Sequence, residues 1–426
     1  MIKLYSHQVV ARKHLMQNNA FALFMDQGSG KTLPILFHLA YLFEHGLISN
    51  AIIIAPLSTL GSWSRDLDKL PKRRRESIGE LEIINYDKVW RRAEIYEKKW
   101  DCIVLDESHS IKHRTSKRSK AVRKMARNGS KYRYILTGTP MSNGHLEEYW
   151  AQYDFLDNSI FNTYKKFSDR YCLLNQFFKP YKYRNTDELI EIINNHCYRI
   201  TKEECLDLPD KLPDEVIKVE LKEKKLYKQM MDNFIKELEI EASNPLVRTI
   251  KLRQIASGFI VNEEGQIHSL KSDKLKILGE LLEARGDKKT VIFAEFKHSI
   301  KSIRHYLEKS NIKHLVLDGD QKDKNIWKKF QSDETEQVIV CQYQTANAGI
   351  DLFASDTIIF YEPTLSSTVN DQAKDRIHRI GQNSKCSYYY LLTKGTLETQ
   401  IYNTVAKGSD FGKEVLLDFI RRGERP

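Results

Sequence analysis

Two short segments in the first third of the chain combine residues suited to phosphate chemistry. The hydrophobic run Ala20–Met25 continues into Asp26-Gln27-Gly28-Ser29-Gly30-Lys31-Thr32, and the run Cys102–Leu105 continues into Asp106-Glu107-Ser108-His109. A strand, a glycine-rich turn and a Lys-Thr pair can enclose a triphosphate, because glycine lets backbone N–H groups approach its oxygens. A strand ending in two acids can hold a magnesium ion and a hydrolytic water. Together the segments predict hydrolysis of ATP with Mg²⁺.

The glycine-rich turn predicts a role for each of its residues. Gly28–Gly30 would present backbone N–H groups to the phosphates, Lys31 would neutralise the β and γ oxygens, and Thr32 would ligate Mg²⁺. Met25 stands where the strict phosphate-loop motif has its first glycine. The alternative is a tight strand-to-helix turn that binds nothing.

The acid pair is expected at the carboxyl end of a buried strand, which is where open α/β sheets bind ligands. Asp106 suits a hydrated metal ion, and Glu107 is placed to orient and deprotonate the attacking water. A lone acidic pair at a strand end is more often a helix cap. Its combination with Lys31 on a neighbouring strand favours the catalytic interpretation.

Charge and composition narrow the class of protein. The chain of 426 residues has 68 basic and 57 acidic residues, a net charge of +11, with basic stretches such as Lys72–Arg75 and Lys112–Arg127. This excess favours a polyanionic partner, although a solvated surface is the simpler alternative. The 6 cysteines include no C-x-x-C pair, which predicts neither zinc nor disulfides and fits a reducing cytoplasm. Apolar runs such as Ala51–Leu57 fall far short of the ~20 residues that span a bilayer, so no membrane partner is expected.

Short Ile/Val/Leu runs alternate with helical patterns in both the first third and the last third of the chain. Continuous runs of this kind predict strands that are covered on both faces, as in a parallel sheet between helices. We therefore expect an α/β fold with two similar lobes and helical insertions between them. The expected boundaries are lobe 1 at 1–155, helical protrusions and linker at 156–275 with a hinge near 206–213, lobe 2 at 276–410, and a tail at 411–426.

A third motif lies near the end of the chain, in the segment from Gln372 to Gln382. It places Arg376 and Arg379 three residues apart, on one face of a predicted helix. Two guanidinium groups presented together can reach a γ-phosphate and stabilise its charge as the bond breaks. An ordinary basic helix face is the alternative.

The ordered set of motifs resembles the Swi/Snf-type DNA translocases of helicase superfamily two. The resemblance runs along nearly the whole chain, and the Arg-Ile-Gly-Gln ending is its most specific part. In chain order the matching segments are His7-Gln8, the phosphate loop, Ala55-Pro56-Leu57-Ser58-Thr59-Leu60, Asp106–His109, Leu136-Thr137-Gly138-Thr139-Pro140 and Asp375–Gln382.

The resemblance implies two RecA-like lobes in tandem, with ATP bound between them, and further site residues. By this resemblance Gln8 would contact the adenine, and the residues that couple hydrolysis to movement would be His109, Thr137 and Thr139. The arginine fingers would be Arg376 and Arg379, and the further nucleotide contacts from lobe 2 would come from Gly349, Asp351 and Gln372. The phosphate backbone of the tracked strand would be contacted by Pro56, Ser58 and Thr345. The expected function is ATP-driven translocation on duplex DNA, with remodelling of DNA or protein–DNA complexes.

Two other functions remain open from the sequence. One is a strand-separating or branch-migrating helicase acting on DNA or RNA, and the other is a nucleic-acid clamp that binds ATP as a switch without hydrolysing it. The expected partner is double-stranded DNA and the expected state is a monomer. The expected location is the cytoplasm of a bacterial cell, or of the host if the gene belongs to a phage. The sequence points to no protein partner.

Overall fold

A computed structural model describes most of the chain. The described residues are 3–141, 144–205, 208–232, 234–235, 240–241, 244–323, 325–346 and 349–412, with the backbone alone for 58, 234–235, 240–241 and 346. The chain separates into two compact units, residues 1–207 and residues 208–426.

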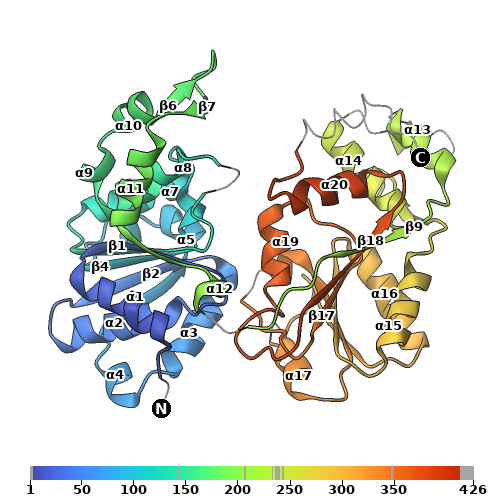
Figure 1. Ribbon diagram of the computed structural model, residues 1–426, viewed down its shortest axis with the longest axis horizontal. Helices are drawn as coiled ribbons and strands as arrows, with labels where there is room; N and C mark the ends of the chain where they lie inside the picture. Colours follow the sequence, from blue (N-terminus) through green and yellow to red (C-terminus); the bar gives the residue numbers. More distant parts are fainter. Residues whose placement is uncertain are drawn as a thin grey trace. The chain divides into compact units, whose positions relative to one another are not determined.

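The first unit is built on a parallel sheet with helices on both faces (Figure 1). The strand order across the sheet is β3-β2-β4-β5-β1-β8, and all of the pairings are parallel. The strands are β1 (Ala20–Met25), β2 (Asn50–Ala55), β3 (Glu80–Asn85), β4 (Cys102–Asp106), β5 (Tyr132–Leu136) and β8 (Cys197–Ile200). This order places the carboxyl ends of β1, β5 and β4 side by side.

Alternate side chains of these strands enter two separate hydrophobic cores. In β2, Ile52 and Ile54 pack on one face of the sheet, whereas Ile53 packs on the other. Successive side chains of a strand point to opposite faces, so an unbroken apolar run is stable only where helices cover both faces.

Helices and one hairpin complete the first unit. Its helical segments are α1 (Ser6–Gln17), α2 (Thr32–Glu44), η1 (Leu57–Thr59), α3 (Leu60–Asp68), α4 (Lys72–Glu76), α5 (Tyr86–Arg91), α6 (Ala93–Tyr96), η2 (Ser108–Ile111), α7 (Lys117–Arg127), α8 (Glu148–Leu156), α9 (Asn158–Phe161), α10 (Tyr164–Tyr171), α11 (Thr186–Asn195) and α12 (Lys202–Cys205). An antiparallel hairpin of β6 (Cys172–Leu174) and β7 (Pro180–Tyr183) lies between α10 and α11.

The second unit repeats the same plan with a second parallel sheet. Its strand order is β15-β16-β14-β17-β18-β9. The strands are β9 (Glu215–Val219), β14 (Thr290–Ala294), β15 (His314–Leu317), β16 (Val338–Gln342), β17 (Thr357–Phe360) and β18 (Ser387–Thr393). The predicted α/β fold of two parallel-sheet lobes is confirmed.

The helices of the second unit also cover both faces of its sheet. They are α13 (Lys224–Met231), α14 (Pro245–Ala256), α15 (Lys274–Arg285), α16 (Lys297–Lys309), α17 (Trp327–Ser332), α18 (Tyr343–Ala346), α19 (Ser367–Lys374) and α20 (Leu397–Ala406). Two hairpins accompany them, β10–β11 (Phe234–Ile235 and Ile240–Glu241) and β12–β13 (Phe259–Val261 and Ile267–Ser269). In the described part of the chain, no helix has the length and apolar character needed to cross a membrane.

The segment 156–275 contains more than protrusions and a linker, because it supplies β8 to the first sheet and β9 to the second. The expected hinge at 206–213 begins with two residues outside the described ones. From Leu208 onward it follows the second unit, where Leu212 N donates to Cys386 O at 2.8 Å and Cys386 N donates to Asp210 O at 3.1 Å. The boundaries at 155, 275 and 410 stay predictions.

Candidate nucleotide-binding site

The glycine-rich turn connects β1 to α2 and is fixed to helix α1. Gly28 and Gly30 have φ angles of 81° and 80°, in the left-handed region that favours glycine. Gln8 Nε2 donates to Gly30 O at 3.0 Å, and a Cβ at Gly30 would lie 2.3 Å from that nitrogen. Buried Ser29 donates through Oγ to Asp26 O at 2.7 Å. The sequence therefore needs glycine here both for the turn and for the approach of Gln8.

Lys31 turns its ammonium group back over the turn that carries it. Its Nζ donates to Met25 O at 2.9 Å and to Asp26 O at 3.4 Å, and the residue is 9% exposed. Thr32 follows as the first residue of α2. A helix N-terminus next to a held cation is an arrangement that attracts anions.

Asp106 ends β4, and its carboxylate is held from three directions. Trp63 Nε1 donates to Oδ2 at 2.8 Å, the Thr59 hydroxyl donates to Oδ2 at 3.2 Å, and Glu107 N donates to Oδ1 at 3.0 Å. Burial raises the pKa of Asp106, and the charge of Glu107 adds to that rise. The contacts from Trp63 and Thr59 act in the opposite direction by stabilising the ionised form.

Glu107 is adjacent in sequence but differs in environment. Its φ of 48° places a non-glycine residue in the left-handed region, a strained conformation that is often found at functional sites. Burial opposes its ionisation, yet the charge of Lys31 and the contacts from His109 and Thr137 together hold the pKa of Glu107 below its usual range. Glu107 is therefore ionised at neutral pH and is surrounded by groups that orient it.

The predicted coupling residues form a hydrogen-bonded cluster around Glu107. The Thr137 hydroxyl donates to Glu107 Oε2 at 3.2 Å and accepts from Thr139 N at 3.1 Å. His109 Nδ1 lies 3.2 Å from the same hydroxyl and 3.3 Å from Glu107 Oε2. Gly138 packs against the glycine-rich turn, where a Cβ would lie 3.2 Å from Gln27 N. The ends of β1, β4 and β5 thus meet in one site.

Several contributors to this site were missed or only partly identified from the sequence. Trp63 is 1% exposed, as an ordinary core residue would be, and it also binds Asp106. His7 Nε2 lies 2.9 Å from Ser29 O, and Tyr86 donates its hydroxyl to Asp106 O at 2.8 Å. Each of these three residues has a ring that packs in the core and a polar atom that binds the site. A sequence pattern does not distinguish such a ring from an ordinary core residue.

The predicted contacts with a nucleic-acid backbone lie near other strand ends. Pro56 directly follows β2, and its carbonyl accepts from the Thr59 hydroxyl at 3.2 Å. The side chain of Ser58 lies outside what the structure describes. In the second unit, the Thr345 hydroxyl donates to Leu317 O at 2.7 Å and to Gln342 O at 2.8 Å.

The arginine motif of the second unit is not helical, and that prediction was wrong. Helix α19 carries Gln372 and ends at Lys374, so Arg376 and Arg379 follow it in turns. Tertiary hydrogen bonds fix this path: Gln382 Nε2 donates to Ser355 O at 2.8 Å, and His378 Nε2 lies 2.9 Å from Pro209 O. Such contacts override local helix propensity.

The two arginines nevertheless contact the loop that carries Gly349 and Asp351. Arg379 forms an ion pair with Asp351 and donates to Ile350 O at 3.2 Å. Leu352 N donates to the backbone oxygen of Arg376, whose side chain is largely buried. Gly349 has a φ of 54° at the start of this loop. The loop 349–352 and the arginine turns are thus one connected structure.

The basic stretches are largely paired with acids. Arg118 pairs with Asp87 at 2.7 Å, Lys112 with Glu148 at 3.1 Å, and Arg127 with Asp154 at 2.7 Å. Ion pairs of this kind support the simpler alternative for the 112–127 stretch, a solvated helix face.

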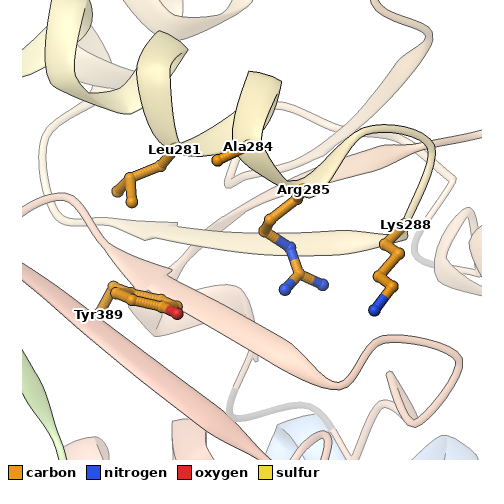
Figure 2. A pocket seen from close by; sticks show the side chains of 5 residues that line it. All are labelled: Leu281, Ala284, Arg285, Lys288 and Tyr389. Atoms are coloured by element: carbon orange, nitrogen blue, oxygen red, sulfur yellow. The ribbon is translucent and has the colours of Figure 1, made fainter.

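A separate cavity of about 240 Å³ in the second unit contains none of the predicted site residues. Figure 2 shows Leu281, Ala284, Arg285, Lys288 and Tyr389 around it. The Arg285 guanidinium already donates to Asp356 at 2.6 Å and to Thr290 at 2.8 Å. The guanidinium of Arg285 therefore already has structural partners within the protein.

Comparison with known families gives two matches in tandem. Residues 72–258 match the SNF2-related domain, and residues 273–381 match the helicase conserved C-terminal domain. The chain belongs to the Swi/Snf-type family. The glycine-rich turn precedes the matched stretch of this Swi/Snf-type chain, whereas the acid pair and Arg376 and Arg379 lie inside the two matches.

Individual Swi/Snf-type relatives are distant and longer. An uncharacterized ATP-dependent helicase, MG018 of Mycoplasma genitalium, is 28% identical over 98% of this chain and 42% of its own length. The putative ATP-dependent helicase/translocase YwqA of Bacillus subtilis is 28% identical over 88% of this chain and 44% of its own. The chain spans less than half the length of these curated relatives. A solved structure, the Sulfolobus solfataricus SWI2/SNF2 ATPase core in complex with dsDNA, is 25% identical with a TM-score of 0.45, covering 100% of this chain and 94% of that one.

Proposed function

We propose that this chain is a nucleic-acid-dependent ATPase that uses ATP hydrolysis to translocate on duplex DNA and remodel DNA or protein–DNA complexes. One observation carries the proposal: the carboxylate of Glu107, whose side chain is 13% exposed, is held by Thr137 and His109, and the charge of Lys31 helps to keep its pKa below the usual range. A carboxylate fixed in this way can accept a proton from a water that attacks a phosphate. The relatives named as ATP-dependent helicases support the same activity.

The glycine-rich turn would bind the triphosphate through its N–H groups. The ammonium group of Lys31 would leave the backbone oxygens of Met25 and Asp26 and bind the β and γ phosphate oxygens instead. The contacts of Gln8 with Tyr5 N at 3.0 Å and with Gly30 O already use its amide to hold the turn in shape. Contact of Gln8 with adenine stays a prediction. Gln8 therefore acts first as a support for the phosphate site.

Thr32 and Asp106 are the residues that would hold Mg²⁺. A threonine hydroxyl and a carboxylate are the hard oxygen ligands that Mg²⁺ prefers alongside water and phosphate. Asp106 accepts three hydrogen bonds within the protein, and a carboxylate has about four acceptor positions, so the donor set fits a hydrated ion. The ion would neutralise charge on the phosphates as the terminal bond breaks.

In the second unit, Arg376 and Arg379 would stabilise the charge that develops on the γ-phosphate, with Gly349, Asp351 and Gln372 completing the nucleotide contacts. Pro56, Ser58 and Thr345 would contact the nucleic-acid backbone, and Thr137, Thr139 and His109 would link hydrolysis to movement. We propose that the chain acts as a monomer in the cytoplasm. The net charge of +11 supports a polyanionic track.

ATP hydrolysis measured with blunt duplex, forked duplex, single-stranded DNA and RNA tests the proposal, with Lys31→Ala as the blank. Loss of the ammonium group should lower the stimulated rate by about a hundredfold or more, since it removes charge stabilisation at the phosphates. Lys69→Ala is the matched control, because Lys69 is exposed and pairs with Asp66 in the same unit. Absence of stimulation by every nucleic acid would contradict the proposed motor.

A further inference from the structure

The β6–β7 hairpin exposes aromatic side chains that serve no core. Phe177 is 70% exposed, Phe178 84% and Tyr181 66%. Figure 1 shows β6 and β7 projecting beyond helix α10 at one end of the first unit. Exposed aromatic residues that lie together in this way usually mark a binding surface.

Hydrogen bonds within the turn define the conformation of the hairpin tip. Asn175 Oδ1 accepts from Phe177 N at 2.9 Å and from Lys179 N at 3.1 Å. Asn175 N donates to Lys179 O at 2.9 Å, and Phe178 N donates to Asn175 O at 2.9 Å. Phe178 has a φ of 56°, a left-handed conformation that is unfavourable for a bulky side chain. The turn thus keeps an aromatic ring where glycine or asparagine would fit with less strain.

The base of the hairpin is anchored in the core of the first unit. Tyr171, which precedes β6, is 3% exposed, packs against Phe161 and Phe167, and donates its hydroxyl to Glu188 at 2.8 Å. Tyr183 at the end of β7 donates its hydroxyl to Glu147. The rings at the tip are therefore held at a fixed position on the unit.

The surroundings of the rings are cationic. Lys179 and Lys182 lie on the hairpin itself and Arg184 follows it, whereas Arg170 is ion-paired with Glu188 at 2.7 Å. Glu147, which binds Tyr183, also lines a cavity of about 320 Å³ that includes His113, Arg114 and His145, in which Lys112 is paired with Glu148. A partner must offer both negative charge and flat apolar faces.

We propose that Phe177 and Phe178 stack on unpaired bases, so that the chain binds a nucleic acid with a single-stranded stretch or junction more tightly than an unbroken duplex. The phosphates would contact Lys179 and Lys182. Only an unstacked base exposes a flat face on which an aromatic ring can stack. This inference rests on the proposed function, since both require nucleic-acid binding. It adds the substrate feature that the hairpin recognises.

The second unit supplies a matched control hairpin. The tip between β12 and β13 carries Glu263 and Glu264 rather than lysines, and Ile267 beside it is 48% exposed. An acidic tip repels phosphates, so Ile267→Ala removes an exposed apolar side chain from a hairpin that is not expected to bind a nucleic acid.

The test compares binding of a blunt duplex and a forked duplex with the same number of phosphates, measured by fluorescence anisotropy without nucleotide. The double variant Phe177→Ala/Phe178→Ala should weaken binding of the fork by about tenfold or more, because stacking on each ring is lost. Binding of the blunt duplex should stay within about twofold, as phosphate contacts remain. Phe177→Tyr/Phe178→Tyr, which keeps both rings, and Ile267→Ala should behave as wild type.

A 2-aminopurine base in the single-stranded arm gives a direct signal, because stacking on a ring quenches its fluorescence. We expect quenching with wild type and with the tyrosine variant, and its loss with the alanine variant. Equal weakening on both substrates, or no weakening on either, would overturn the inference while leaving nucleic-acid binding intact. If wild type binds neither substrate, it is the proposed function that fails. Unchanged thermal unfolding of the alanine variant shows that it is folded.

Discussion

The candidate site of the first unit and the arginine turns of the second hold their cations in different ways. Lys31 donates to backbone carbonyl oxygens, whereas Arg379 is ion-paired with Asp351. A cation held by neutral carbonyls can move to a phosphate without separating a charge pair. A cation held by a carboxylate must exchange one anion for another. If the proposed function is correct, Lys31 would bind a phosphate without breaking an ion pair, whereas Arg379 would be available to a phosphate only after its pair with Asp351 opens.

The largest expected effect tests the second half of this comparison. Arg379→Ala should lower stimulated ATP hydrolysis by about a thousandfold, since an arginine that reaches the transferred phosphoryl group is worth that much in rate. Nucleotide affinity, measured with a fluorescent ATP analogue, should change little. Arg379→Lys should recover only part of the rate, because lysine lacks the planar fork.

Lys385→Ala is the matched control for Arg379, because Lys385 is exposed in the same unit and pairs with Asp210. Should Arg379→Ala lose nucleotide affinity in proportion to its rate, Arg379 would be a binding residue like Lys31, and the contrast between the two units would disappear.

A second variant tests how the first unit divides binding from chemistry. Glu107→Gln should lower hydrolysis by about a hundredfold or more, because the amide cannot accept the proton of the attacking water. Nucleotide affinity should persist, since Lys31 and the glycine-rich turn are unchanged. Glu76→Gln, on the exposed face of α4, is the control. Unchanged function on nucleic acid in Glu107→Gln, with ATP binding intact, would support the ATP-switched clamp instead.

The smallest expected effect concerns the two adjacent carboxylates. Because the pKa of Asp106 is raised in the folded protein, wild type should lose stability as pH rises from about 4, the ordinary value for Asp, to that raised pKa. Asp106→Asn removes this loss and keeps an acceptor for Trp63. In the absence of divalent cations and ATP, the variant should be more stable by about 1–2 kcal/mol at pH 8, with no difference below pH 4.

Urea unfolding followed at both pH values measures that difference. A variant that is less stable than wild type at pH 8 would mean that the contacts from Trp63 and Thr59 outweigh the burial of the charge. Glu107, with its pKa lowered, should show the opposite trend: the stability that its ionised form contributes is lost as pH falls below about 4.

Much of this arrangement was predictable because the strands of both sheets are unbroken apolar runs. Ala20–Met25 and Cys102–Asp106 are strands as expected, and their parallel pairing with β5 places Lys31, Asp106 and Thr137 at one edge. The outer strands β8 and β9 were not foreseen. They are short, and apart from Val219 their side chains are exposed or half-buried, so the helical patterns around them dominate the sequence signal.

Sequence reasoning was least informative where distant contacts decide local shape. The spacing of Arg376 and Arg379 fits a helix, but the bonds from Gln382 and His378 to distant backbone oxygens end the helix at Lys374. The role of Trp63 was hidden for a similar reason, because the atom that matters is one nitrogen on an otherwise buried ring. Neither feature produces a periodic pattern in the sequence.

The attachment of the glycine-rich turn to α1 affects how a nucleotide arrives. Gln8, Ser29 and Asp26 hold the turn in its curved shape through bonds within the protein. A ligand that meets a prearranged loop loses little conformational entropy by ordering it. We therefore expect diffusion and charge attraction to set the rate at which a nucleotide binds to the first unit, without a slow rearrangement of the loop.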